Sequence, residues 1–179
     1  MEELAACGAH TMIRVGTCGG IDLAVLGGDL VVATAAVRQE GTTLHYMPIE
    51  FPAAADFEVT DALRLGAQST GANVHTGVVQ SKDSFYGQHE PGRMPVADEL
   101  RYKWNAWKRA GVLCSEMESS TLFVVSSVLG LRAGAVFAVL WNQERRDAGL
   151  SNPECMDTNL AVEAAIEGLK CLIMRDTAE

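Results

Sequence analysis

A glycine-rich turn near the start of the sequence has the residue types of an anion-binding loop. It reads Arg14-Val-Gly16-Thr17-Cys-Gly-Gly20 and continues a short apolar run. Glycines let backbone N–H groups approach a phosphate, a threonine hydroxyl adds a donor, and a guanidinium matches two phosphate oxygens. The segment fits neither the dinucleotide fingerprint nor the P-loop, because it lacks G-x-G-x-x-G and Gly-Lys-Ser/Thr. From these residues alone, a phosphate site and a purely structural turn are both open.

A second polar group, Ser115-Glu116-Met117-Glu118, follows a short apolar run. Ser115 and Glu118 have the S-x-x-E spacing of a capping box, which by itself accounts for both residues at a helix start. A carboxylate in that place also accepts hydrogen bonds from vicinal sugar hydroxyls. Glu116 and Glu118 point to different sides of a helix, so we expect at most one of them to face a ligand.

The third candidate segment is 84–89 (SFYGQH), which is followed by Arg93. An aromatic ring such as Phe85, the amide of Gln88 and a guanidinium can together stack on a planar heterocycle and read its carbonyl and N–H edge. A mobile solvated loop is the alternative interpretation. His89 alone is a poor acid or base, because the sequence places no carboxylate beside it to orient the ring.

These segments need a scaffold that brings them together, and the hydrophobic pattern predicts alternating strands and helices. Short β-branched runs predict strands at 11–15, 29–37, 73–79 and 133–140. Helices are expected from Asp56, as N-cap, to Gly71, at 97–110 and at 115–129. Within the second of these, Trp104 and Trp107 are expected to pack against the sheet, with a stacking platform for a ligand as the alternative.

A further helix near the C-terminus is predicted by Val162, Ile166, Leu169 and Ile173, whose spacing would turn all four side chains inward. Strands alternating with helices indicate one α/β domain over residues 1–179. Its central sheet is expected to be mainly parallel or mixed and flanked by helices, with its site at the carboxyl ends of strands.

Composition excludes several classes of protein. The 179 residues are 48% hydrophobic and 21% charged, which argues against a disordered or coiled-coil chain. With 14 Lys and Arg against 23 Asp and Glu the net charge is -9, so nucleic acid is not an expected partner. No apolar run approaches the roughly 18 residues of a membrane span, and the start lacks signal-peptide character, so we expect a cytoplasmic protein. Five cysteines without a Cys-x-x-Cys pair predict reduced thiols and no metal site.

Together, the three segments resemble the nucleoside phosphorylase family, and within it the uridine phosphorylase branch. Arg14-Val-Gly-Thr-Cys-Gly is similar to the family's phosphate loop, and 82–88 (KDSFYGQ) resembles its base-binding loop. The stretch 44–58 (LHYMPIEFPAAADFE) is similar to one typical of the uridine enzymes, and Glu116-Met-Glu118 matches the ribose-binding signature. The four motifs occur in the family's order and cover nearly the whole chain.

The resemblance implies that inorganic phosphate attacks uridine to give uracil and ribose 1-phosphate, with no cofactor and with phosphate as co-substrate. It implies a homo-oligomer, since family members are hexamers built from dimers. The roles carried over by motif are phosphate binding by Arg14, Gly16 and Thr17, ribose binding by Thr17, Met117 and Glu118, and base binding by Phe85, Gln88 and Arg93, with His89 as the fallback for Arg93.

Two departures from the family pattern affect these expectations. The spacing from Gln88 to Arg93 differs from the commoner form, which is why His89 is the fallback. The sequence also begins where the family has already completed its first strands and another phosphate-binding Arg, so we expect an N-terminally truncated, C-terminal portion of the family fold. The alternatives are an inactive nucleoside-binding or assembly remnant, a nucleosidase, and a purine nucleoside phosphorylase; the last is disfavoured because 140–143 (LWNQ) lacks the purine branch's Asp.

Overall fold

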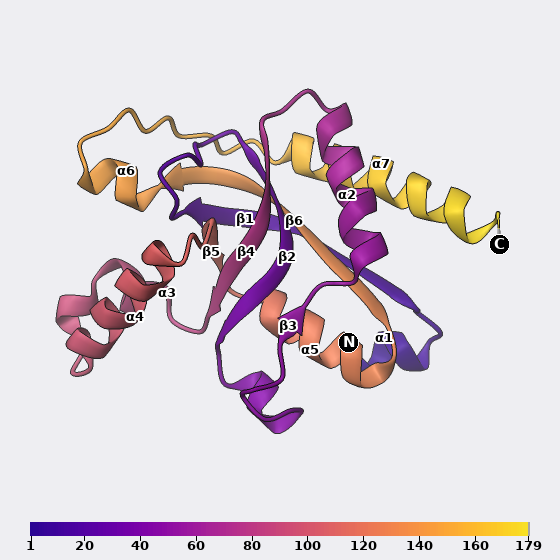
Figure 1. Cartoon of the computed structure of the whole chain (residues 1–179), viewed down its shortest axis with the longest axis horizontal. Helices are drawn as coiled ribbons and strands as arrows, with labels where there is room; N and C mark the ends of the chain where they lie inside the picture. Colours follow the sequence, from indigo (N-terminus) through magenta and orange to yellow (C-terminus); the bar gives the residue numbers. More distant parts are fainter. Residues whose placement is uncertain (179) are drawn as a thin grey trace.

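The fold is organised around a mixed sheet of six strands, described in a computed structural model of residues 1–178 (Figure 1). The strand order is β3-β2-β4-β5-β1-β6, and β2 also pairs with β6, so the sheet closes on itself. The pairs β1–β6, β2–β4 and β4–β5 are parallel, whereas β1–β5, β2–β3 and β2–β6 are antiparallel. The strands are β1 (Thr11–Gly20), β2 (Leu30–Gln39), β3 (Ala53–Ala54), β4 (Val74–Lys82), β5 (Cys114–Glu116) and β6 (Arg132–Asn142). The expected α/β fold with a mixed sheet is confirmed, and β1, β2, β4 and β6 contain the four predicted strands.

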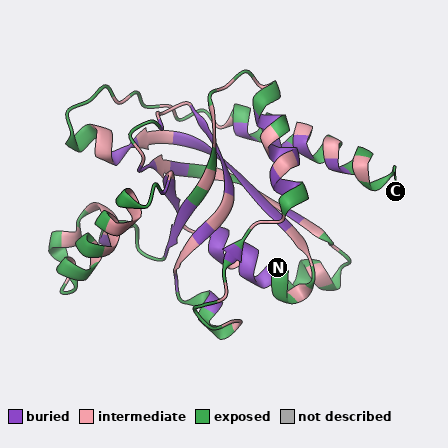
Figure 2. Ribbon diagram, viewed as in Figure 1, coloured by how far each residue is buried: buried purple, intermediate pink, exposed green. Residues whose placement is uncertain are grey.

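Helices cover both faces of the sheet. Side chains alternate along β2, so Val31 and Ala33 pack toward α5 while Leu30 and Val32 pack toward α2 and α7. Figure 2 shows this buried layer running through the centre of the molecule. No helix within residues 1–178 is long and apolar enough to cross a membrane. The helices are α1 (Glu2–Ala6), α2 (Phe57–Ser69), α3 (Phe85–His89), α4 (Ala97–Arg109), α5 (Ser119–Leu129), α6 (Gln143–Asp147) and α7 (Asn159–Asp176), with short 3-10 turns at Thr42–His45 and Pro91–Arg93.

Helix α2 begins as its sequence predicts. The side chain of Asp56 accepts a hydrogen bond of 2.9 Å from the amide of Val59, which satisfies one of the unpaired N–H groups of the first turn. The helix ends at Ser69, two residues before Gly71, whose φ of +76° is the left-handed conformation that glycine adopts at little cost. Local chemistry therefore fixes both ends of this helix.

The expected inward face of the C-terminal helix is wrong. Val162, Ile166, Leu169 and Ile173 are 45–54% exposed. Helix α7 instead buries a parallel stripe of small residues, which packs closely against α2 (Figure 1). The exposed stripe and the buried stripe both have helical spacing. The stripe with the smaller side chains faces α2, because the two helix backbones approach each other closely. The buried residues of α7 are Ala161, Ala164, Ala165, Gly168 and Leu172.

The α2–α7 contact gives a test of this packing. A Cβ added at Gly66 would lie 2.3 Å from the carbonyl oxygen of Ala164 and 2.6 Å from the amide nitrogen of Gly168. Gly66→Ala should therefore lower the free energy of unfolding by about 1 to 3 kcal/mol, although alanine is the better helix former. The measurement is urea denaturation. Gly41→Ala is the control, because its nearest neighbour would lie at 3.7 Å, and equal stability of the two variants would contradict the packing.

Candidate active site

The three candidate segments meet at one end of the sheet, where β1, β4, β5 and β6 finish and α3 and α5 begin. They line a common cavity of about 200 Å³. This is the arrangement expected when loops at strand ends carry a site. Of the residues that the sequence singles out, those lining the cavity are Arg14, Thr17, Phe85, Gln88, His89, Ser115, Glu116, Met117 and Glu118.

The expected turn after Arg14 is wrong, because residues 14–20 continue strand β1 and pair with β6. Within this strand, Gly16 lies close to the guanidinium of Arg14. A Cβ at this glycine would lie 3.0 Å from Nη2 of Arg14 and 3.1 Å from its Cζ. The guanidinium is also 5.5 Å from the centre of the Phe137 ring, close enough for a cation–π contact. Any larger residue at position 16 would therefore require the guanidinium of Arg14 to shift by a few tenths of an ångström.

Arg14 is paired with two carboxylates. Its Nε lies 3.3 Å from Oε2 of Glu116, and its Nη2 forms an ion pair with Glu118. The Glu116 side chain is fully buried, whereas the Glu118 side chain is 56% exposed. Glu118 can consequently turn away and leave the guanidinium to another anion, while Glu116 is held by its surroundings.

Glu116 caps helix α5, and the expected capping box is wrong. Its carboxylate accepts hydrogen bonds from the amides of Glu118 at 2.9 Å and Ser119 at 3.0 Å, and from the hydroxyl of Ser81. The helix starts at Ser119, and Ser115 belongs to β5, where pairing with β1 and β4 overrides its local capping tendency. A buried carboxylate at a helix N-terminus is favoured by the helix dipole.

The segment 84–89 is a short helix rather than a solvated loop. The Ser84 hydroxyl caps α3 by accepting a hydrogen bond of 2.9 Å from the amide of Gly87. The His89 ring lies 4.1 Å from that of Phe85 and 5.8 Å, stacked, from that of Trp141. Burial and the nearby charge of Lys82 lower the pKa of His89, so its imidazole is neutral near pH 7. Phe85 and His89 thus form an aromatic wall with a hydrogen-bonding edge.

Arg93 lies outside the cavity. Its side chain is 62% exposed, its Nη1 is 2.7 Å from Oε2 of Glu90, and its guanidinium lies over the ring of Tyr86. It lines neither the 200 Å³ cavity nor its neighbour. Arg93 ends the 3-10 turn Pro91–Arg93, which follows α3 and holds the arginine outside the cavity.

Sequence reasoning missed Lys82, which stands at the end of β4 and lines the cavity. It is only 6% exposed, and its Nζ donates a hydrogen bond of 2.5 Å to Oγ of Ser115. Burial lowers its pKa from 10.5 to about 8, against the opposing attraction of Glu116. Lys82 is the first residue of the motif 82–88 (KDSFYGQ), but the motif predicts no role for it, and a lysine directly after an apolar strand is equally typical of a lysine in solvent.

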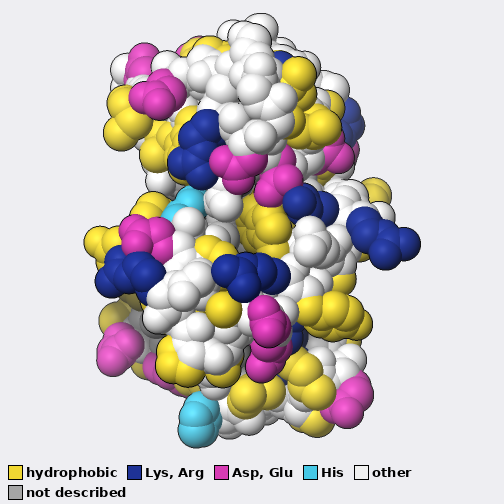
Figure 3. Space-filling model, turned by 90° about the vertical axis from the view of Figure 1, so that its left-hand side faces the viewer, with side chains coloured by type: hydrophobic (Ala, Val, Ile, Leu, Met, Phe, Trp, Pro, Cys, Tyr) yellow, Lys and Arg dark blue, Asp and Glu magenta, His cyan; other side chains and the backbone are white. Residues whose placement is uncertain are grey.

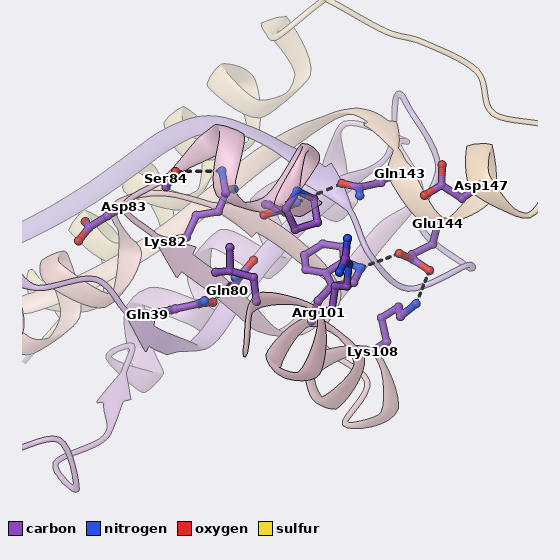
Figure 4. Close-up of a pocket in the computed structure, with 15 residues that line it drawn as sticks. Gln39, Gln80, Lys82, Asp83, Ser84, Arg101, Lys108, Gln143, Glu144 and Asp147 are labelled. Atoms are coloured by element: carbon purple, nitrogen blue, oxygen red, sulfur yellow. Dashed lines mark hydrogen bonds and ion pairs between the residues drawn. The ribbon is translucent and has the colours of Figure 1, made fainter. Parts of the chain in front are cut away.

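A second cavity, of about 480 Å³, adjoins the first and shares Lys82 and Gln88 with it (Figure 4). It lies between β4, α4 and α6. Trp104 borders it and donates a hydrogen bond of 2.6 Å to Glu144, which also accepts one of 2.7 Å from Lys108. Trp104 thus links α4 to α6, while Nε1 of Trp107 donates a hydrogen bond of 3.2 Å to Oε1 of Gln39 at the end of β2. No group of three or more His, Cys, Asp or Glu among residues 1–178 is placed to hold a metal ion.

Figure 3 faces this end of the molecule. Lys and Arg side chains are interspersed there with Asp and Glu, and they do not gather into one basic patch. Such a surface offers no extended positive field for a polyanion, whereas the local cations Arg14 and Lys82 line the cavity itself. The site suits a small ligand.

The mixed α/β sheet brings the arginine–glycine segment of β1, a buried capping glutamate and an aromatic–amide segment around one cavity, which suits an enzyme site for a small ligand. The sequence model described as "Phosphorylase superfamily" matches residues 1–167, and the chain belongs to this superfamily.

Several similar proteins are phosphorylases by name. The uridine phosphorylase of Treponema pallidum is 50% identical over 177 residues, which cover 99% of this chain and 69% of that protein. The uridine phosphorylase of Escherichia coli is 40% identical, with 97% and 70% covered. The guanosine phosphorylase of Halorubrum lacusprofundi is 36% identical, with 93% and 66% covered.

The two glutamates of the site should differ in their contribution to stability. Glu116→Gln removes a buried charge that caps α5 and pairs with Arg14, so it should lower the free energy of unfolding by about 1 to 3 kcal/mol. Glu118→Gln alters an exposed side chain that makes no cap hydrogen bond, so its effect should stay within about 0.5 kcal/mol. Urea denaturation of the two variants measures the difference, and a larger loss in Glu118→Gln would contradict the role of Glu116 as the residue that caps α5.

Proposed function

We propose that this chain catalyses the phosphorolysis of uridine, giving uracil and ribose 1-phosphate. The observation that carries the proposal is the meeting of three segments, the Arg14–Thr17 part of β1, Met117-Glu118 and the helix with Phe85 and Gln88, around one cavity. The names of the uridine phosphorylases that it resembles over nearly its whole length support the choice of substrate. Inorganic phosphate is the co-substrate, and no cofactor takes part.

Arg14, Gly16 and Thr17 would bind the phosphate. Two features support this role: Arg14 lies at the cavity wall, and Thr17 of the same strand, β1, lines the cavity beside it. In the free site the guanidinium is paired with Glu118. When phosphate takes that place, the exposed carboxylate of Glu118 becomes available to accept hydrogen bonds from the ribose hydroxyls.

Ribose would lie between the phosphate and the base, against Thr17, Met117 and Glu118. The base would pack on Phe85, with its polar edge toward Gln88. For the second base contact we propose His89 in place of Arg93, because the imidazole lines the cavity and the arginine is held at the surface by Glu90.

The reaction moves charge in opposite directions along the scissile bond. A phosphate oxygen forms a bond to the anomeric carbon, the bond from that carbon to N1 of the base breaks, and its electron pair leaves with the base. A dianion beside the cationic sugar and donors aimed at the leaving base both bind more tightly as the bond breaks. Each aimed donor contributes about 2.7 to 4 kcal/mol, so Gln88 and His89 suffice without a general acid.

Purine nucleosides are the second candidate substrate, because one similar protein is named a guanosine phosphorylase. The ring of Trp141, stacked on His89, limits the space beside Phe85. The segment 140–143 (LWNQ) also contains no acid to assist a leaving purine. Pyrimidine is therefore favoured. A nucleosidase is disfavoured because hydrolysis has no need of a guanidinium at the nucleophile position.

Homo-oligomer formation is also proposed. The exposed apolar stripe of α7, formed by Val162, Ile166, Leu169 and Ile173, supports it, since exposed apolar patches commonly mark protein interfaces.

The function is tested by uracil release from uridine, with and without phosphate. Release should require phosphate, and Arg14→Ala should reduce it at least 100-fold, because losing a charge-assisted pair to the phosphate costs a few kcal/mol. Arg64→Ala, on the far side of α2, is the control. Faster reaction of inosine would assign the purine branch, phosphate-independent release a nucleosidase, and binding of uridine without turnover an inactive binding module.

The second base contact is tested by a pair of variants. His89→Ala should lower kcat/KM for uridine about tenfold or more, which corresponds to about 1.4 kcal/mol of lost transition-state binding. Arg93→Ala should change it less than twofold, since this side chain contacts Glu90 and Tyr86 at the surface. The reverse ranking would return the role to Arg93.

A further inference from the structure

A glutamine alone does not distinguish uracil from cytosine. Uracil presents N3–H beside a carbonyl oxygen, and cytosine presents a bare N3 beside an amino group. The glutamine amide carries one acceptor and one donor of similar size, so turning it by 180° exchanges the two patterns. Discrimination by Gln88 therefore requires that something fix which way its amide points.

The structure contains such a restraint. Oγ of Ser115 donates a hydrogen bond of 2.7 Å to Oε1 of Gln88, and Nζ of Lys82 donates one of 2.5 Å to the same Oγ. Nε2 of Gln88 points the other way, 3.4 Å from Oε1 of Gln143. Ser115 and Lys82 are both buried, so water does not readily replace these partners.

The direction of this chain of hydrogen bonds follows from its first member. An ammonium has donors and no acceptor, so the oxygen of Ser115 must accept from Lys82. The hydroxyl proton is then free for Oε1 of Gln88. Turning the amide would bring Nε2 to Ser115 and leave the buried hydroxyl proton without an acceptor, which is unfavourable.

We propose that Lys82, acting through Ser115, is the residue that holds the Gln88 amide in the orientation that binds uracil and rejects cytosine. Oε1 keeps a second lone pair for N3–H, and Nε2 donates to the adjacent carbonyl. Lys82 is a positioning residue in this scheme. The proposal rests on the proposed function, because it assumes that Gln88 contacts the base.

The cost of burying Lys82 supports a functional role. Within the described residues Lys82 forms no ion pair within 4.0 Å, and a buried cation without a close counter-ion is destabilising. Its nitrogen needs only one hydrogen bond to Ser115 to direct Gln88. A hydrophobic residue would pack at this position at less cost, but it would not set the direction of the Ser115 hydroxyl.

The restraint depends on pH. The pKa of Lys82 is lowered to about 8, chiefly by burial. The other titratable groups around it are Glu116 and Cys114 of β5, Glu118 before α5, Cys18 of β1 and His89 of α3. Below pH 8 the ammonium can only donate. Above it the neutral amine can accept a hydrogen bond from Ser115, which frees Oε1 of Gln88 and lets the amide turn.

The experiment measures uracil and cytosine recognition in the same variants. Binding of the two free bases by calorimetry, and kcat/KM for uridine and cytidine where turnover occurs, give a selectivity ratio that we expect to reach about 10⁴ in the parent protein. Lys82→Met and Ser115→Ala should each lower this ratio at least tenfold. Lys108→Met is the matched control, because that lysine pairs with Glu144 in the neighbouring cavity. Thermal melting shows that each variant is folded.

The pH profile separates positioning from a merely structural role. The selectivity ratio of the parent protein should be constant from pH 6.5 to 7.5 and fall above pH 8, while that of Lys82→Met should not show this step. Because Lys82→Met experiences the same titration of the bases, it removes their contribution. Equal loss of uracil and cytosine binding in Lys82→Met, or an unchanged ratio, would overturn the proposal.

Failure of the proposed function gives a different result. If neither nucleoside is cleaved but uracil binds more tightly than cytosine, catalysis is refuted and the Lys82 proposal is judged on the binding ratios alone. If neither base binds, the assignment of Gln88 to the base fails and the Lys82 proposal fails with it.

Discussion

The buried carboxylate of Glu116 is the interaction on which the rest of the site depends. It accepts hydrogen bonds from the backbone amide at the start of α5, from the hydroxyl of Ser81 in β4, and from Nε of Arg14 in β1. One side chain thereby joins three elements that are far apart in the sequence. Its charge is also the nearest compensation for Lys82, so the two cations of the cavity are placed around one fixed anion. Moving Glu116 would disturb the helix start and both cationic groups together.

How far the sequence predicts the fold depends on whether a signal is local. The start of α2 follows from Asp56 and the residues next to it, and it is predicted correctly. The buried face of α7 depends on how closely α2 approaches it. Gly66 in α2 and Gly168 in α7 allow this close approach, and the two residues lie far apart in the sequence. Periodicity alone therefore identifies the helix correctly and its buried face wrongly. The same holds for Ser115, whose capping pattern is overridden by strand pairing with distant residues.

The site shows the same limit. Arg14, Thr17, Gln88 and Glu118 could be selected because each belongs to a motif, and the fold brings all four to one cavity. Lys82 belongs to the motif 82–88, but no role could be predicted for it, because a lysine after a strand is ordinarily solvated and its burial against Ser115 of β5 follows from tertiary packing. For Arg93, residue type favours a base contact, whereas the structure places its side chain at the surface beside Glu90, so this assignment stays a prediction.

The charges of the cavity are arranged along a direction that matters for bond cleavage. Two cations, Arg14 and Lys82, face two carboxylates, Glu116 and Glu118, so a bound phosphate dianion adds negative charge at the Arg14 end. In the proposed reaction the sugar becomes positive at that end, and the base becomes negative beside Gln88 and Lys82. The positive sugar then offsets the excess negative charge around the phosphate, and the negative base offsets the positive charge of Lys82. The field of the site therefore favours the transition state over the bound substrate. The polarity comes from residues fixed by the fold, and no side chain needs to reorganise as the bond breaks.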